Sequence, residues 1–355
     1  MTTTRTDDAT TGRRERKASP YRQWQDTQGI PIHTGSYVKD LYTAELKPWA
    51  LVGQKGAFVN LADQETSDGW LIEIAAAGST EVMHHLCEAT IFVLEGRGAT
   101  TFWQEGSAKE SVEWKRGSIV APPLNCYYQN FNGDGQAPAR LLIVTSAPVV
   151  LNQFRHAEFL FNDTFVFNQR FDGSGSFFSA PAEREGPFRW RTNFVPDIRT
   201  HAVEPKPHRG QDNVGINFTM SNNSMAVAAS EFPPGSYKMA HRHSVGAYVF
   251  ILSGQGFSLL RWEGEEEARR VDWKDGCILS PKAGEFHQHF NTGDTPARYL
   301  KIRPGALNAE HWNGGQPDQI DYADEDPRIY EAYAAECARN GMKPFAHPGR
   351  VNARK

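Results

Sequence analysis

The chain has 355 residues, of which 39% are hydrophobic and 23% are charged, and this length accommodates two or three domains of ordinary size. Its formal net charge of −4 gives no electrostatic basis for binding nucleic acid or a membrane surface, so we expect neither as a partner. No apolar stretch has the length of a signal peptide or a membrane span, and we therefore expect a cytoplasmic protein.

The first 150 residues begin with a polar tail and continue into a predicted β domain. Residues 1–20 are rich in threonine, arginine and aspartate, which predicts a disordered N-terminus. Residues 21–150 form the first predicted domain, with an irregular lead-in up to about residue 70. Apolar runs at Ile91–Leu94 and Ser118–Ala121 then predict strands.

A break in this pattern separates the first domain from a second one. Residues 151–205 include a stretch crowded with phenylalanine, arginine, asparagine and glycine, which predicts a long connecting segment. Residues 206–305 are assigned to the second β domain, and residues 306–355 to a tail. Within the tail a helix is predicted over about 327–340, because an Asp-Pro pair marks its start and a glycine marks its end.

The two β domains repeat one another. The stretch Trp114-Lys-Arg-Gly117 corresponds to Trp273-Lys-Asp-Gly276, 159 positions later. The stretch Pro138-Ala-Arg140 corresponds in the same way to Pro296-Ala-Arg298. Several matching anchors at a nearly constant offset indicate duplication of one module. The 31 glycines and 21 prolines are consistent with many short strands joined by turns, so we expect an all-β chain of two small barrels with a C-terminal helix.

Three histidines of the second copy have the spacing of a metal site. Side chains two apart on a strand share a face, so His241 and His243 are expected to point together into a barrel. On a later predicted strand, His287 shares a face with His289 and Glu285. Three neutral imidazoles on one side of a metal ion leave its other side open for water, substrate or dioxygen. Imidazole suits Fe(II), Mn(II), Zn(II), Ni(II) and Cu(II), and affinity alone does not choose among them.

The residues around these histidines resemble the two motifs of the cupin family. The first motif fits from Gly235 to Gly254, with His241 and His243 in its ligand positions. Where most cupins have a metal-binding glutamate, this chain has Ala247. The second motif, with one extra residue between its proline and the following glycine, is matched by Gly276, Pro281, Gly284, His287 and Asn291. The resemblance implies that each β domain is a cupin barrel, a double-stranded β-helix of the jelly-roll kind.

Three histidines without the glutamate are the pattern of a smaller group of cupins, the gentisate 1,2-dioxygenases and their salicylate and hydroxynaphthoate relatives. The resemblance implies that His241, His243 and His287 bind Fe(II), with other divalent metals possible. It gives His289 a catalytic role, in orienting the substrate or moving a proton. The implied reaction is cleavage of the ring of a hydroxylated aromatic acid, so the expected partners are a small aromatic substrate and O2. We also expect a homo-oligomer.

The first copy lacks equivalent ligands. At the repeat offset, the third and fourth histidines of the second copy are replaced by Tyr128 and Asn130. His84 and His85 are adjacent and face opposite sides of a strand, so we expect this copy to bind no metal and to serve packing and oligomer contacts. An alternative interpretation keeps His84, His85 and Glu88 as a degenerate site formed by a β-bulge.

Two other functions remain open on the sequence alone. One is redox-neutral chemistry, such as that of a lyase, isomerase or decarboxylase using Zn(II), Mn(II) or Ni(II). The other is a binding protein without catalysis. The intact motifs lie in the C-terminal copy, whereas the gentisate dioxygenases keep their iron site in the N-terminal one, so substrate-binding residues outside the motifs are not transferred. Arg209, Arg261 and Arg303 are candidates for binding a substrate carboxylate.

Overall fold

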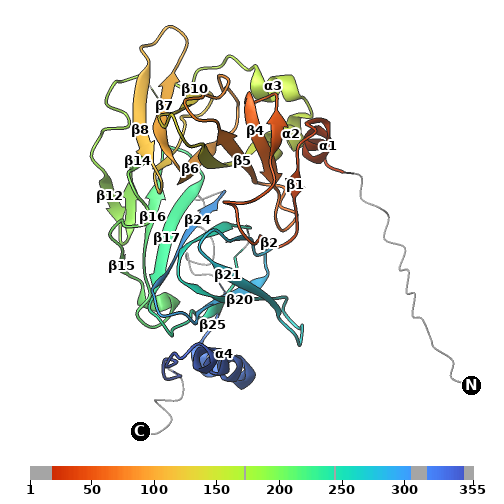
Figure 1. Ribbon diagram of the computed structural model, residues 1–355, viewed down its shortest axis with the longest axis vertical. Coiled ribbons are helices and arrows are strands. Elements are labelled where there is room, and N and C mark those ends of the chain that lie inside the picture. Colours follow the sequence, from red (N-terminus) through yellow and green to blue (C-terminus); the bar gives the residue numbers. More distant parts are fainter. Residues whose placement is uncertain (1–17, 172, 244, 305–317, 348–355) are drawn as a thin grey trace, which may run out of the picture.

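The computed structural model describes residues 18–171, 173–243, 245–304 and 318–347. Its strands form four sheets arranged as two β barrels, and a helix packs at the far end of the second barrel (Figure 1). The predicted all-β fold of two barrels with a C-terminal helix is confirmed. Most of the predicted disordered N-terminus, and much of the predicted tail, lie outside the described residues.

The N-terminal barrel combines an eight-stranded sheet with a three-stranded one. The larger sheet has the order β1-β4-β5-β11-β6-β9-β14, with β3 beside β4, and the smaller sheet has the order β10-β7-β8. The elements of this barrel are α1 (Pro20–Thr27), β1 (Ile32–His33), β3 (Lys47–Trp49), β4 (Gln54–Val59), β5 (Asp68–Ile74), β6 (Ala89–Glu95), β7 (Arg97–Trp103), β8 (Glu110–Lys115), β9 (Ile119–Val120), β10 (Tyr127–Asn132), β11 (Ala139–Thr145), α2 (Ala147–Phe154), α3 (Ala157–Phe161) and β14 (Phe194–Val195).

The C-terminal barrel combines a nine-stranded sheet with a five-stranded one. The larger sheet has the order β12-β13-β16-β17-β24-β19-β22-β2, with β15 beside β16, and the smaller sheet has the order β21-β20-β23-β18-β25. The elements of this barrel are β2 (Tyr37–Val38), β12 (Glu183–Gly186), β13 (Arg189–Arg191), β15 (Glu204–Pro205), η1 (Pro207–Arg209), β16 (Val214–Thr219), β17 (Ala226–Phe232), β18 (Ala240–His241), β19 (Tyr248–Ser253), β20 (Gln255–Arg261), β21 (Arg269–Lys274), β22 (Ile278–Leu279), β23 (Phe286–Asn291), β24 (Ala297–Arg303), β25 (Gln319–Ile320), η4 (Tyr322–Asp324) and α4 (Pro327–Arg339).

The two larger sheets share one strand order, so the repeat in the sequence is also a repeat of structure. Strands β4, β5, β11, β6 and β9 of the first barrel correspond in order to β16, β17, β24, β19 and β22 of the second. Each sheet is completed at one edge by a strand from the other half of the chain. β14 pairs with β9, and β2 pairs with β22.

The larger sheets pack against each other through a shared apolar core. On β11, Leu141 and Ile143 lie inside the N-terminal barrel, whereas Leu142 and Val144 belong to the cluster that joins the two barrels. Leu300 of β24 belongs to the same joining cluster and is 1% exposed. Full burial of such a side chain stabilises the fold by about 1.5–3 kcal/mol relative to exposure. Both faces of these strands are therefore buried.

An arginine of each barrel holds the segment that reaches across to the other barrel. The Arg140 guanidinium donates to the carbonyl of Leu41 at 2.8 Å, and the Leu41 amide donates to the carbonyl of Gly276 at 2.9 Å. In the second barrel, the Arg298 guanidinium donates to the carbonyl of Ile198 at 3.0 Å. The Ile198 amide then donates to the carbonyl of a glycine in the first barrel. The two barrels therefore exchange equivalent segments, and each segment is held by the arginine of one barrel and by a glycine carbonyl of the other.

The predicted irregular lead-in before residue 70 is wrong. It contains helix α1, which begins after the N-cap Ser19, and strands β1 to β4. The helix is polar and docks through hydrogen bonds, since Tyr21 and Gln25 both donate to the buried carboxylate of Asp68. Asp68 lies 47 residues after Tyr21 and 43 residues after Gln25 in the chain. A local sequence pattern does not show a contact over such a separation.

The predicted connecting segment also contains regular structure. It includes the end of α2, all of α3 and four short strands, β12 to β15. The C-terminal helix matches its prediction, because Asp326 caps α4 by accepting from the Arg328 amide. Tyr333 and Cys337 of this helix are buried against the outer face of the smaller sheet, where they meet Phe290.

We expect Gly276→Ala to destabilise the protein more than Gly106→Ala. Both glycines have a positive φ, 93° and 76°, so both variants carry the same kind of backbone strain. A methyl group at Gly276 would also lie 2.7 Å from the Tyr42 ring, in the segment held by Arg140, whereas nothing lies within 4 Å at Gly106. Denaturant unfolding of both variants measures the difference, and equal losses would contradict this role of the segment.

We expect the buried Asp68 carboxyl to make stability fall as the pH rises. Burial raises its pKa to about 7, so the folded protein keeps the proton that the unfolded chain releases above its ordinary pKa. This contribution is complete at acid pH and is lost as the pH rises to about 7, by at most about 1.4 kcal/mol per pH unit. Unfolding free energies between acid and neutral pH should show a flatter profile for Asp68→Asn, and an unchanged slope would contradict the assignment.

Candidate metal centre

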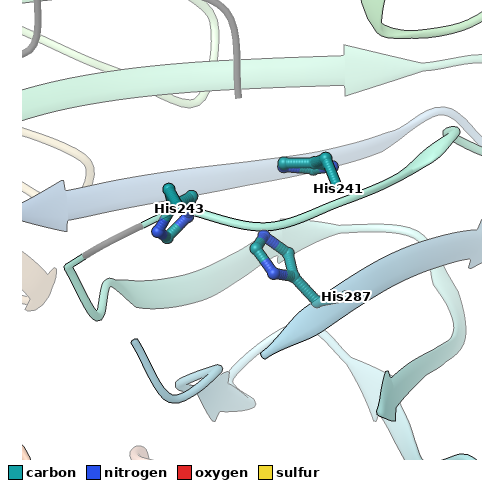
Figure 2. Close-up of side chains that lie close together, drawn as sticks. All are labelled: His241, His243 and His287. Carbon is teal, nitrogen blue, oxygen red and sulfur yellow. The ribbon is translucent and has the colours of Figure 1, made fainter. Parts of the chain in front are cut away.

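Three imidazoles meet inside the C-terminal barrel, on neighbouring strands of the smaller sheet. β18 and β23 are antiparallel, and their pairing places His241 directly opposite His287. His243 follows two residues later on the same side. One ring nitrogen from each histidine lies within 4.8 Å of the others, and Figure 2 shows the three rings facing a common point. The predicted convergence of these side chains is therefore present in the structure.

Backbone carbonyls fix which nitrogen of each ring carries its proton. In all three histidines Nδ1 lies within hydrogen-bonding distance of a backbone carbonyl, which only accepts. The distances are 3.2 Å for His241 to Met239, 2.5 Å for His243 to Val245 and 3.1 Å for His287 to Glu285. Each Nδ1 therefore carries the proton, and each Nε2 keeps a free lone pair, as a metal ligand requires. These donor atoms fit a divalent transition metal.

The histidines are held in their neutral form. Burial, followed by the neighbouring imidazole of His287, lowers the pKa of His241 and His243 well below the ordinary value. Burial lowers the pKa of His287 to about 3. A metal ion therefore does not compete with protons for these nitrogens near neutral pH.

No carboxylate joins the three histidines among the described residues. Ala247, at the position where most cupins have glutamate, is fully buried in the apolar lining of the barrel. Glu285 precedes the strand, and its carboxylate is bound by the Arg269 guanidinium at 2.8 Å and the Lys282 amide at 2.9 Å. The strand pattern predicts that Glu285 shares the inward face of His287. Its carboxylate nevertheless does not join the three histidines.

His289 lies beside the group and is anchored from behind. Its Nδ1 is 2.7 Å from the hydroxyl of Ser258, which also accepts from the Trp273 indole at 2.9 Å. The first barrel has the same chain of contacts, in which the Trp114 indole donates to Thr100 and Thr100 donates to the amide oxygen of Asn130. Both barrels therefore hold this side chain through a tryptophan and a hydroxyl group. The held residue is a histidine only in the second barrel, where it is His289.

The corresponding residues of the first barrel point to different partners. Both ring nitrogens of His85 are engaged, by the Cys87 carbonyl at 3.0 Å and by the Tyr128 hydroxyl at 2.9 Å. His84 lies 3.1 Å from the Asn125 carbonyl. Glu88 accepts from the Ser224 amide of the other barrel at 2.9 Å. The structure does not bring His84, His85 and Glu88 together, so it does not support the alternative site.

Two of the three candidate arginines lie near the histidines. Besides burial, the positive charge of Arg209, on η1, lowers the pKa of His241 and His287. The charge of Arg303, at the end of β24, likewise lowers the pKa of His243. Arg261 faces away, because the preceding residue contributes to the barrel lining.

Sequence reasoning missed two lysines close to the same histidines, Lys238 and Lys301, and a third, Lys206, close to Lys238. The internal repeat could have revealed one of these lysines. Lys301 aligns with Ile143, an apolar residue that points inward in the first barrel.

Comparison with known proteins gives a family match for part of the chain and solved structures with a similar fold. Residues 229–303 match the family model described as cupin domain. Bacillus subtilis oxalate decarboxylase is similar over 84% of both chains, with 13% identity and a TM-score of 0.52. Salicylate 1,2-dioxygenase from Pseudaminobacter salicylatoxidans covers 72% of this chain and 75% of its own, with 12% identity and a TM-score of 0.52. Vicilin from Corylus avellana covers 89% of this chain and 96% of its own, with 12% identity and a TM-score of 0.51.

Residues 229–303 therefore match a cupin domain, and the chain has the same fold as these three proteins. A search of curated protein sequences gives no match. None of the described helices is long and apolar enough to cross a membrane. At 12–13% identity these likenesses concern the fold, and enzymes with different reactions share it.

We expect His287→Ala to lose metal binding and His85→Ala to keep it. Removal of one of three ligands takes away a bond that water does not replace equally well, whereas both nitrogens of His85 are already bonded within the protein. The measurement is the metal content of each variant after reconstitution with Fe(II), Mn(II) or Zn(II) and gel filtration. Equal metal content in wild type and His287→Ala would show that the metal binds elsewhere.

Proposed function

We propose that this protein is a non-haem Fe(II)-dependent dioxygenase that cleaves the ring of a hydroxylated aromatic acid with O2. The observation that carries the proposal is the three-histidine group, which no carboxylate of the described residues joins, since Ala247 is apolar and Glu285 is bound elsewhere. Three ligands on one side leave room on a six-coordinate ion for both a chelating substrate and dioxygen. The resemblance of the histidine motifs to gentisate-type enzymes supports the same reaction.

Each residue of the centre has a distinct part in this proposal. His241, His243 and His287 hold the ion through Nε2, with their rings fixed by the carbonyl contacts at Nδ1. The bound ion supplies the redox chemistry that activates dioxygen and the substrate together. Arg209 and Arg303 stabilise the carboxylate of the substrate from the side of the barrel wall.

His289 has a positioning role or a proton-transfer role next to the ion. Its Nδ1 faces Ser258, so its Nε2 is the atom directed to a substrate or a water molecule. Because the first barrel carries asparagine at this place with the same anchor, His289→Asn changes the chemistry of the side chain in a setting that accepts asparagine.

A redox-neutral reaction is the second candidate, because oxalate decarboxylase has a similar fold. A decarboxylation or isomerisation on the same metal would consume no dioxygen. Oxygen consumption therefore separates the two candidates.

We expect the Fe(II)-loaded protein to consume O2 when it is given the right hydroxylated aromatic acid. The assay reconstitutes the protein with Fe(II) without air and then follows oxygen by electrode and the aromatic band by ultraviolet absorbance. The substrates are gentisate, salicylates, hydroxynaphthoates and catechols. His289→Asn should retain its iron and lose at least about 100-fold in turnover, the lower range of a proton-transfer or orienting contribution.

His287→Ala and His85→Ala serve as controls for the oxygen assay. Uptake coupled to loss of the aromatic band should vanish in the first variant and persist in the second. Absence of oxygen uptake with every aromatic acid, in a protein that has bound iron, would reject ring cleavage. Full turnover by His289→Asn would reject the role of His289 without affecting the rest of the proposal.

A further inference from the structure

The C-terminal barrel gathers four basic side chains around the three histidines, and a fifth, Lys206, lies beside them. They come from η1 and the residue before it, from the loop before β18, and from β24, and they are Lys206, Arg209, Lys238, Lys301 and Arg303. Lys206 and Lys238 are buried, with 8% and 2% exposure. Besides burial, the charges of these side chains lower one another's pKa, so the five residues lie close together. We call them the basic cluster.

The basic cluster has no acidic counterpart in the described part of the chain. None of its members forms an ion pair with a described carboxylate. Lys238 donates instead to the Tyr299 hydroxyl at 2.9 Å, and Lys206 donates to the Asn217 side-chain oxygen at 3.1 Å. Glu204, an acid whose charge raises the pKa of Lys206, accepts from the Arg184 guanidinium at 2.7 Å instead. A buried cation without a counter-charge is costly, and several together repel one another.

One donor in the basic cluster has no partner among the described residues. Nη1 of Arg209 is buried and forms no hydrogen bond. Removal of such a nitrogen from water without a replacement acceptor costs about 1–3 kcal/mol or more, since the group is charged. An anionic ligand would supply the missing acceptor.

The first barrel shows that the fold itself does not require these charges. Strand register aligns Lys301 of β24 with Ile143 of β11, and Ala228 of β17 with Trp70 of β5. The first barrel thus fills its interior with Trp70 and Ile143, which belong to its apolar core. The second barrel has a much smaller side chain at one of these positions and a cation at the other. The exchange removes apolar packing and adds positive charge at the same place.

We propose that the substrate carries at least two acidic groups, one directed to the three histidines and another bound by the basic cluster. This inference rests on the proposed function for the site, and it adds the substrate class. A single carboxylate neutralises one charge and is satisfied by one arginine or a pair of cations. Five basic side chains without an acidic counterpart exceed that need, so a monoacid leaves most of their donors without a partner.

The test is calorimetric binding of matched acids to the Zn(II)-reconstituted protein at low ionic strength. The pairs are benzoate with isophthalate and propionate with succinate, and phosphoglycolate tests phosphate as the second acid. At least one diacid should bind about tenfold more tightly than its monoacid, the gain expected from one further charge-assisted contact. If no diacid exceeds its monoacid, the inference is overturned.

Variants of the basic cluster assign the second acid to its site. Lys301→Met and Lys206→Met should each weaken binding of the diacid by about tenfold and leave binding of the monoacid within about threefold. Lys115→Met, an exposed lysine on β8 of the first barrel, is the control and should change neither. Diacid binding by Lys301→Met at wild-type affinity would overturn the assignment.

Thermal stability without ligand separates binding from a structural role. A lysine that only supports the fold should lower the melting temperature when it is replaced, whereas an unpaired cation should raise it by about 2 °C or more on replacement by methionine of similar shape. A lower melting temperature for both lysine variants would contradict the inference. Lys301→Arg should restore diacid binding. Since these measurements use neither iron nor O2, they stand or fall separately from the dioxygenase proposal.

Discussion

The fold depends on the apolar contact between the two larger sheets. Residues that point away from each barrel interior, such as Leu142 and Val144 on one side and Leu300 and Ile302 on the other, pack against each other and exclude water. Because strands alternate, this joint also decides which side chains face inward. Tyr299 and Lys301 point into the C-terminal barrel because their neighbours Leu300 and Ile302 face the other barrel. The functional interior is therefore positioned by contacts made on its outer side.

Duplication explains how this scaffold supports a site in one barrel alone. Several devices occur twice, among them an asparagine that ties down a turn by donating to a backbone carbonyl at 2.8 Å, Asn132 in the first barrel and Asn291 in the second. These devices stabilise both copies. The interior positions differ, because the first barrel is filled with apolar side chains and the second carries imidazoles and cations. With the shell held in common, the interior of one copy is free to serve chemistry at the expense of packing.

The parts that sequence could predict are those encoded locally. The period of two on a strand gave the shared face of His241 and His243, and an Asp-Pro pair gave the start of the last helix. The basic cluster could not be found in this way, since Lys206 and Lys301 are about a hundred residues apart in sequence and meet only through sheet pairing. Helix α1 escaped for a similar reason, as it is attached by two hydrogen bonds to a distant buried carboxyl and by packing of Tyr21 and Trp24 on the core. Long-range polar contacts leave no periodic trace in the chain.

The exchange of edge strands has a consequence for how the chain becomes a folded molecule. β9 of the first barrel is covered by β14, which is synthesised after the first barrel is otherwise complete, while β22 of the second is covered by β2 from near the start of the chain. During synthesis, the first barrel must therefore wait with an open edge until about fifty further residues have emerged, and the second barrel receives its cover from a segment made long before. Separation of the two halves would leave each with an unpaired edge, the kind of surface from which β proteins aggregate. Gene fragments that encode one barrel each are in this sense incomplete, even though each contains every strand of its own repeat.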